Sequence, residues 1–288
     1  MQASNEILNA LGCRVVLRST DLLPVLDIFL PGLEHHRSIV IEVPEHAWYR
    51  TAPSARQTWI VEQSPGTRPL APFTWETHST WAGCTVVLSS GFSIGVIIAV
   101  DDRSVDITYK LISTLPMAIY EARISTCVKL YRPFMDIFLE RTFIHGTMGI
   151  DLLAAETPTR LNMNAEEWLP CRYIASSFPS SPLPSTARVS EEEHAVHYFR
   201  QGPADASFIA TEATCSKWVA ASYARTPSYI WTNPARTCHH LDWGVSLSET
   251  GIGEISQRLY ILRGTAQDVW DLIRSTDSAI AARSALPS

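Results

Sequence analysis

Charged residues, and lysines above all, are scarce in this sequence. Charged residues make up 18% of its 288 residues, and Lys110, Lys129 and Lys217 are the only lysines among 23 basic residues. Hydrophobic residues make up 46%, so the chain can fill a large core and does not have the composition of a disordered chain. The formal net charge is −6, so the chain has no excess of basic residues to neutralise the phosphates of a nucleic acid. We therefore expect nucleic acid not to be the main ligand.

Long hydrophobic runs and a basic amino terminus are missing too. The longest apolar stretches, near 22–30 and 94–100, are far shorter than the about 20 residues that a membrane-spanning helix needs. The first six residues contain no basic side chain, which argues against a signal peptide. The expectation is a soluble protein of the cytoplasm or of a virion, without a membrane partner.

Closely spaced cysteines are also absent. The six cysteines are scattered and form no C-x-x-C pair, which is typical of reduced core thiols. His194 and His197 lie three residues apart on an expected helix, and Cys238-His239-His240 adds further metal-binding side chains. Neither spacing matches a zinc signature. We therefore predict no metal site and place both helix histidines on a solvent-facing side.

Short β-branched and aromatic segments follow one another through the first 115 residues. After a short helix expected at 4–11, such segments occupy 13–17, 38–43, 58–62, 73–81, 84–89, 93–100 and 105–111. Proline, glycine, serine or aspartate separates them, as in strands joined by turns. The pattern predicts a β-rich region over residues 1–115, folded as an antiparallel sandwich or an open barrel.

Residues 116–288 are predicted to form an α+β region. Apolar residues at helical spacing between Ile119 and Leu139 predict two helices that are separated at Pro133. Further helices are expected at 190–201, at 212–225 and after Thr265, with strands at 207–210, 229–232, 240–248 and 255–262. A Pro/Ser-rich loop occupies 176–189. The predicted fold class of the whole chain is therefore α+β.

One fragment has the character of an enzyme motif. Phe143-Ile144-His145-Gly146-Thr147 resembles the first motif of the histidine-containing ADP-ribosyltransferases, which bind NAD and cleave its bond to nicotinamide. The resemblance implies that His145 and Thr147 contact the ribose and nicotinamide region of NAD. The competing interpretation is a turn, with Gly146 supplying the backbone freedom.

The remaining ADP-ribosyltransferase motifs have less definite counterparts. The second motif, a strand with an aromatic residue, corresponds either to 172–177, which contains Tyr173, or to 208–211. The late acidic residue, which stabilises the positive ribose as nicotinamide leaves, corresponds to Glu249 or Glu254. The resemblance covers residues 143 to 262 and implies an enzyme with NAD as its cofactor.

Tryptophan is unusually abundant in this sequence, with nine copies. Trp48, Trp75, Trp81 and Trp231 lie beside turns or in alternating segments, where they pack in a core or anchor a protein interface. Together with the preference for arginine over lysine, they favour a non-enzymatic structural or assembly protein without a cofactor. Its partners would be copies of itself or a larger assembly, such as a viral capsid that it forms or decorates. The NAD-using enzyme is the alternative.

Overall fold

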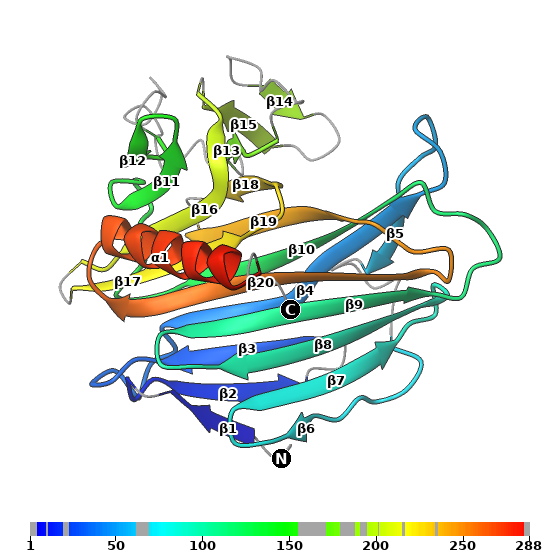
Figure 1. Ribbon diagram of the computed structural model, residues 1–288, viewed down its shortest axis with the longest axis horizontal. Helices are drawn as coiled ribbons and strands as arrows, with labels where there is room; N and C mark the ends of the chain where they lie inside the picture. Colours follow the sequence, from blue (N-terminus) through cyan, green and yellow to red (C-terminus); the bar gives the residue numbers. More distant parts are fainter. Residues whose placement is uncertain are drawn as a thin grey trace.

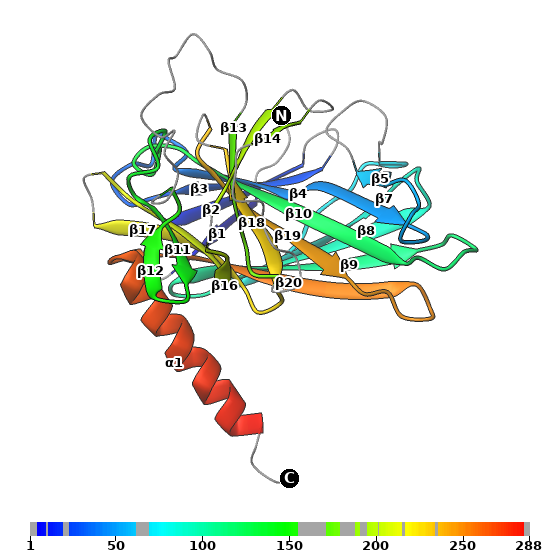
Figure 2. The same cartoon turned by 90° about the horizontal axis from the view of Figure 1, so that it is seen from above.

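Two β-sheets lie face to face and enclose the hydrophobic core (Figure 1). The computed structural model describes residues 5–9, 11–19, 23–61, 69–154, 171–178, 188–190, 195–200, 202–214, 217–233 and 236–284. Seen from above, the sheets form two layers, and the single described helix, α1 (Ala266–Ser284), starts beside one of them and points away from both (Figure 2).

The larger sheet has 11 strands within the described residues. Its order is β1-β2-β3-β4-β10-β19-β18-β13-β15-β14, and β5 also pairs with β4. Only β13 and β15 pair in parallel among its described strands. The bounds are β1 (Asn5–Leu8), β2 (Arg14–Ser19), β3 (Pro24–Phe29), β4 (Ile39–Arg50), β5 (Thr58–Val61), β10 (Glu121–Leu130), β13 (Cys171–Ser176), β14 (Arg188–Ser190), β15 (Ala195–Phe199), β18 (Ser228–Thr232) and β19 (Cys238–Val245).

The smaller sheet has nine strands in the described part of the chain, in the order β12-β11-β16-β17-β20-β9-β8-β7-β6. Their bounds are β6 (Glu76–Thr77), β7 (Trp81–Val87), β8 (Phe92–Val100), β9 (Ser104–Ser113), β11 (Thr142–Gly146), β12 (Gly149–Leu152), β16 (Ala204–Glu212), β17 (Trp218–Ala224) and β20 (Ile252–Arg263). Both sheets combine strands from before and after residue 115, because β4 pairs with β10 and β9 pairs with β20.

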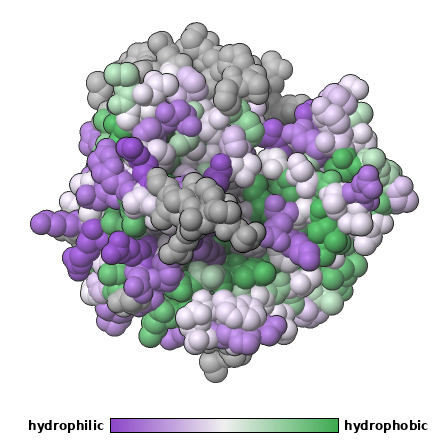
Figure 3. All heavy atoms as spheres, in the orientation of Figure 1, coloured by the Kyte–Doolittle hydropathy of each residue, from purple (hydrophilic) through white to green (hydrophobic). Residues whose placement is uncertain are grey.

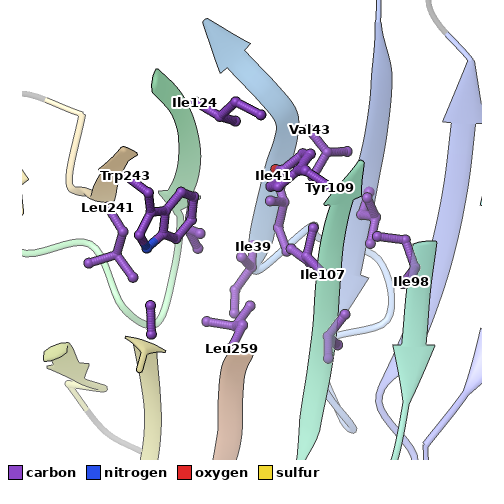
Figure 4. Packing of buried hydrophobic residues seen from close by; sticks show 14 of the residues in the cluster. Ile39, Ile41, Val43, Ile98, Ile107, Tyr109, Ile124, Leu241, Trp243 and Leu259 are labelled. Carbon is purple, nitrogen blue, oxygen red and sulfur yellow. The ribbon is translucent and has the colours of Figure 1, made fainter. Parts of the chain in front are cut away.

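Alternation along the central strands fills the space between the sheets. On β19, Leu241 and Trp243 point into the core, where Trp243 approaches Tyr109 of β9 with 6.3 Å between ring centroids (Figure 4). Ile39 and Ile41 of β4 pack in the same layer and are fully buried. Since successive side chains of a strand point to opposite faces, the residues between these point away from the core.

The predicted α+β fold class is wrong, and the segment after residue 116 shows why. The predicted helices there are replaced by β10, by a connection over residues 131–141 and by β11. Ile124 and Val128 are four residues apart, an even number, so they share one face of a strand as well as one face of a helix. With Ala122 and Leu130 they form the buried side of β10.

The other helices predicted before residue 265 are also wrong, because strands occupy these segments. β1 lies within the helix expected at 4–11, β15 within that at 190–201, and β17 within that at 212–225. β17 is alanine-rich, yet it pairs with β16 on one side and with β20 on the other. Its residues are nearly all buried, so packing between sheet neighbours outweighs the helix propensity of alanine.

Most β-strands predicted in the first 115 residues, and the final helix, are confirmed. The strands expected at 84–89, 93–100 and 105–111 correspond to β7, β8 and β9, whereas the one expected at 73–81 is reduced to β6. The final helix has its expected cap, because Thr265 Oγ1 lies 3.3 Å from the backbone nitrogen of Asp268 and the Asp268 carboxylate accepts from the Thr265 backbone nitrogen at 2.8 Å. Val269 and Ile273 attach α1 to the outer side of the smaller sheet.

No helix in the described part of the chain is both long and apolar enough to cross a membrane.

One buried hydrogen bond joins the two sheets at the centre of the core. The hydroxyl of Tyr109 (β9) lies 2.6 Å from Oγ1 of Thr126 (β10), and both side chains are fully buried. Tyr109→Phe is expected to lower the free energy of unfolding by about 1–3 kcal/mol, because it leaves the Thr126 hydroxyl buried without this partner. Urea denaturation followed by circular dichroism measures the loss.

The double variant provides the control. Tyr109→Phe combined with Thr126→Val removes both polar groups, so its loss should be smaller than the sum of the two single losses. Additive losses would show that the two hydroxyls do not interact across the core.

Candidate functional site

The outer side of the larger sheet, which faces away from the smaller sheet, carries an unusual set of polar and aromatic side chains. The strand register places them opposite one another: Cys127 of β10 faces His240 of β19 and Glu42 of β4, and Ser125 faces Asp242. We call this surface the polar face. It comprises Glu42, Glu45, His46 and Trp48 near or on β4; Arg123, Ser125, Cys127 and Lys129 on β10; Cys238, His240 and Asp242 on β19; and Tyr229 and Trp231 on β18.

Aromatic rings surround an arginine at one end of the polar face. The guanidinium carbon of Arg123 lies 4.8 Å from the ring centroid of Tyr229, 5.4 Å from that of Phe178 and 5.7 Å from that of Trp48. Arg123 Nε also donates to Glu121 at 2.7 Å. Trp48 and Tyr229 are half-buried, so parts of both rings are accessible from outside. This group therefore offers flat apolar surfaces beside charged hydrogen-bonding groups.

Asp242 connects this aromatic end to the centre of the polar face. One of its carboxylate oxygens accepts from Nε1 of Trp231 at 2.9 Å, and the other accepts a short hydrogen bond from the hydroxyl of Ser125. These contacts hold the carboxylate in one orientation next to Tyr229, its neighbour on β18. Asp242 itself is half-buried and can accept further hydrogen bonds from a ligand.

The centre of the polar face is a buried group of two thiols, an imidazole and a carboxylate. Nε2 of His240 lies 2.9 Å from Sγ of Cys238 and 3.5 Å from Sγ of Cys127. Nδ1 of the same ring lies 2.9 Å from Oε2 of Glu45. The ring of Trp231 stacks on the imidazole with 3.4 Å between centroids and 10° between planes. Both nitrogens and one face of the His240 ring thus have specific neighbours.

Charges in this buried group shift the pKa values strongly. Burial opposes the charged form of His240, but the negative charges of Cys238 and Glu45 outweigh it and raise the pKa of the imidazole to about 10. Burial likewise opposes ionisation of Glu45, yet the charge of His240 lowers the pKa of that carboxyl to about 2. The hydrogen bond with Cys127 and the charge of His240 lower the pKa of Cys238, while burial raises that of Cys127.

The neighbouring histidine belongs to the opposite side of the sheet. His239 points into the core, where its ring nitrogens lie 2.9 Å from Oγ1 of Thr211 and 3.2 Å from Oγ of Ser222. Complete burial lowers the pKa of His239 to about 3, so this ring is neutral at physiological pH. Two adjacent histidines thus have opposite pKa shifts because β-strand alternation places them in different environments.

His145 lies on β11 of the smaller sheet, and Thr147 follows it in the connection to β12. His145 of β11 stacks on Trp270 of α1 with 4.0 Å between centroids, and its Nδ1 lies 2.5 Å from Oδ1 of Asp205. Thr147 is exposed in the two-residue connection between β11 and β12, whose ends pair at Gly146 and Gly149. The His-Gly-Thr fragment is therefore part of a β-hairpin, but Gly146 is a strand residue, and the glycine with positive φ in this hairpin is Gly149 (φ 112°).

Tyr173 lies on a different sheet from His145. It lies on β13 of the larger sheet, buried and stacked against Tyr198 with 4.9 Å between centroids. The fragment at 208–211, the rival choice for the second motif, lies on β16, beside β11. An NAD site built from His145, Thr147 and Tyr173 would therefore need side chains from both sheets.

Glu254 is exposed on β20 and lines a groove of about 550 Å³ on the outer side of the smaller sheet. Tyr223, Arg258 and Asp277 of α1 line the same groove. His145 approaches it only indirectly, because Trp270 lies between His145 and Tyr223. Figure 3 views this side of the molecule and shows hydrophilic residues gathered mainly on the left and hydrophobic residues mainly on the right. Glu249, the other acidic candidate, lies in the turn before β20.

The four tryptophans predicted as interface anchors lie in three different parts of the fold. Trp48 and Trp231 lie on the polar face, half-buried and 9% exposed respectively. Trp75 packs against the main core, and Trp81 is exposed and stacks on His78 with 4.0 Å between centroids. Their participation in contacts between chains stays a prediction.

The polar face was missed by sequence reasoning, although part of its signal was visible. The alternation predicted for 240–248 is confirmed in β19, and it correctly separates Asp242 from Leu241 and Trp243. Cys127 gave no signal, because it lies 111 positions from Cys238 and meets it only through the pairing of β10 with β19. Of the two histidines considered as metal ligands, His197 lies on β15, and His194 lies outside the described residues.

Comparisons with known proteins show a shared fold and no sequence family. No protein family model matches the chain, and no curated protein matches it by sequence. The α-N-acetylgalactosaminidase NagBb of Bifidobacterium bifidum, solved in complex with GalNAc, shares the fold with a TM-score of 0.50 and 11% identity. The match covers 93% of this chain and 38% of that one. The chain therefore spans well under half the length of NagBb.

Two full-length matches have lower scores. A putative aldose 1-epimerase of Escherichia coli K12 has a TM-score of 0.44 and 9% identity, over 90% of this chain and 98% of that one. An aldose epimerase homologue of Caenorhabditis elegans has a TM-score of 0.47 and 9% identity, with the same two coverages.

The predicted function as a structural or assembly protein of a virus is wrong. The solved structure that shares this fold at a TM-score of 0.50 is an α-N-acetylgalactosaminidase and not a capsid protein. The abundant tryptophans that favoured assembly have another explanation here, since Trp231 and Trp243 pack within the chain.

Proposed function

We propose that this protein binds a carbohydrate on the polar face of the larger sheet. The observation that carries the proposal is the combination of the accessible rings of Trp48 and Tyr229 with the charged groups of Arg123 and Asp242. A sugar ring presents C–H groups on one side and hydroxyl groups around its edge. It is therefore complementary to a flat aromatic ring flanked by hydrogen-bonding charges.

The rigidity of these groups supports the proposal. Arg123 is oriented by Glu121, and Asp242 is oriented by Trp231 and Ser125, so neither side chain must be ordered when a ligand arrives. Preorganised groups lose less conformational entropy on binding. The fold shared with NagBb supports a hexose as the ligand, and GalNAc is the natural first probe because that enzyme was solved with it. For this chain we propose sugar binding alone and no glycosidase activity.

Titration with monosaccharides tests the proposal. Isothermal calorimetry with GalNAc, galactose, glucose and GlcNAc should give saturable binding of at least one sugar, with a millimolar or lower Kd, which corresponds to about 4 kcal/mol or more. Trp48→Ala and Tyr229→Ala should each weaken that binding about tenfold, equivalent to about 1.4 kcal/mol of lost contact.

Trp81→Ala is the matched control, because Trp81 is an accessible tryptophan of the smaller sheet that stacks on a histidine. It should leave the affinity unchanged. Thermal unfolding of each variant verifies that the fold is retained. Absence of saturable binding for all four sugars would refute the proposal, as would binding that survives both Trp48→Ala and Tyr229→Ala at full strength.

A further inference from the structure

Three side chains of the polar face direct sulfur and nitrogen atoms at one point. Sγ of Cys127, Sγ of Cys238 and Nε2 of His240 all lie within 4.8 Å of one another, and all three residues are buried. Cys238 and His240 are two positions apart on β19, so their side chains share a face. Cys127 faces His240 directly from β10. Two hydrogen-bonded strands thus fix the relative positions of three side chains that commonly bind metals.

The surroundings of His240 are those of a metal-binding imidazole. A histidine that binds a metal through one ring nitrogen usually directs the other at a carboxylate, which fixes the orientation of the ring. Here Nε2 faces the two sulfur atoms, and Nδ1 lies 2.9 Å from Oε2 of Glu45 on the opposite edge. Trp231, stacked at 3.4 Å, prevents the imidazole from rotating out of this position.

We propose that Cys127, Cys238 and His240 bind a zinc ion. Two thiolates and one imidazole are typical zinc ligands, and soft sulfur ligands select zinc over magnesium or calcium. Zinc bonds of about 2.3 Å to sulfur and 2.0–2.1 Å to nitrogen place the two atoms about 3.5 Å apart in a tetrahedron. The Cys127–His240 distance of 3.5 Å already has this value, and the Cys238–His240 distance of 2.9 Å must lengthen by about 0.6 Å to reach it.

The fourth coordination position adjoins two carboxylates. Three residues of β4 lie between Glu42 and His46, opposite the single residue of β10 between Ser125 and Cys127, and this bulge brings both Glu42 and Glu45 towards Cys127. Carboxylate oxygens of both glutamates lie within 4.8 Å of Cys127 Sγ. Glu42 also pairs with Lys129. Because Glu45 is held at Nδ1 of His240, a water molecule or the Glu42 carboxylate would complete the tetrahedron.

The zinc proposal is independent of carbohydrate binding. Its ligands are Cys127, Cys238 and His240, whereas the sugar site depends on Trp48 and Tyr229 at the aromatic end of the polar face. A protein that binds metal without sugar, or sugar without metal, would distinguish the two proposals directly.

Cobalt substitution tests the site in the full-length chain. Protein purified under reducing conditions is stripped with a chelator and titrated with Co²⁺. One equivalent should produce the thiolate-to-cobalt charge-transfer band and the intense visible bands of tetrahedral Co²⁺, and Zn²⁺ should abolish both. Cys127→Ser, Cys238→Ser and His240→Gln should each lose these bands or weaken cobalt binding by at least tenfold, while Glu45→Gln should weaken it by about 10–100-fold.

Cys84→Ser provides the control, because Cys84 lies on β7 of the smaller sheet and outside the cluster. It should bind cobalt like the unmodified protein. The proposal is overturned if the folded, reduced wild-type chain shows no tetrahedral spectrum with cobalt, or if the spectrum persists after both cysteines are replaced. A disulfide between Cys127 and Cys238 in protein isolated without oxidant would also overturn it. The wild-type spectrum decides even if a variant fails to fold.

Discussion

Replacing Trp243 with alanine is expected to lower the free energy of unfolding by about 3–5 kcal/mol. The indole is fully buried between the sheets, near Tyr109 of the opposite sheet and next to Leu241 of its own strand (Figure 4). Because the hydrogen-bonded strands hold the sheets at fixed positions, the neighbours can fill only part of the cavity that remains. Urea unfolding followed by circular dichroism measures the loss.

Trp243→Phe separates the contribution of volume from that of the indole nitrogen. Nε1 of Trp243 is buried without a hydrogen-bond acceptor among the described residues, and such a group costs about 1–3 kcal/mol. Phenylalanine removes this cost while it keeps part of the ring, so its loss should be less than half that of alanine. Equal losses for the two variants would contradict this explanation. Trp81→Ala, at an exposed position, should change stability by no more than about 0.5 kcal/mol.

Trp231→Ala is expected to have the second large effect, again about 3–5 kcal/mol of unfolding free energy. This ring contributes two contacts that alanine cannot replace. Its face covers the imidazole of His240 at 3.4 Å, and its Nε1 donates to Asp242 at 2.9 Å. Loss of the ring exposes a buried charged group on one side and frees a carboxylate on the other. Urea unfolding again provides the measurement.

Trp231→Phe retains the stacked ring and removes only the N–H donor. The loss should fall to about 1–3 kcal/mol, the range for a hydrogen bond to a charged group. Trp231→Phe and Asp242→Asn should be non-additive in a double-mutant cycle, because both act on the same contact. Additive losses would indicate that Trp231 stabilises the sheet through packing alone.

The two tryptophans illustrate how neighbouring strands of the larger sheet serve both the core and the polar face. On β19, Trp243 and Leu241 point inward, whereas Cys238, His240 and Asp242 point outward. Trp231 of β18 faces His240 from the adjacent strand. A rigid core beneath the polar face keeps its side chains in register. A binding site on such strands is positioned more precisely than a site on a flexible loop.

Local sequence patterns predicted an element correctly where only one period, that of a helix or that of a strand, fitted them. The alternation at 240–248 predicted β19 together with the side on which Asp242 lies, and the Thr265–Asp268 spacing predicted the cap of α1. The strands β7, β8 and β9 were predicted because turn residues separate their β-branched segments clearly.

The same patterns failed where two periods fitted equally well. Ile124 and Val128 satisfy a helix and a strand alike, and only the pairing of β10 with β4 and β19 decides between them. The alanines of β17 favour a helix in isolation, but β16 and β20 supply hydrogen bonds to both edges of this segment. Tertiary contacts therefore outweighed local propensity in both segments.

By itself, the sequence determined that this protein has a large core, few charges and a β-rich first half, because these properties depend on composition and on neighbouring residues. It also placed His240 and Asp242 in one alternating segment. Only the tertiary structure decided that Cys127, Glu45 and Trp231 surround His240. Contacts between residues 100 or more positions apart depend on which strands pair and in which register, and that choice minimises the free energy of the whole sheet rather than of any one segment.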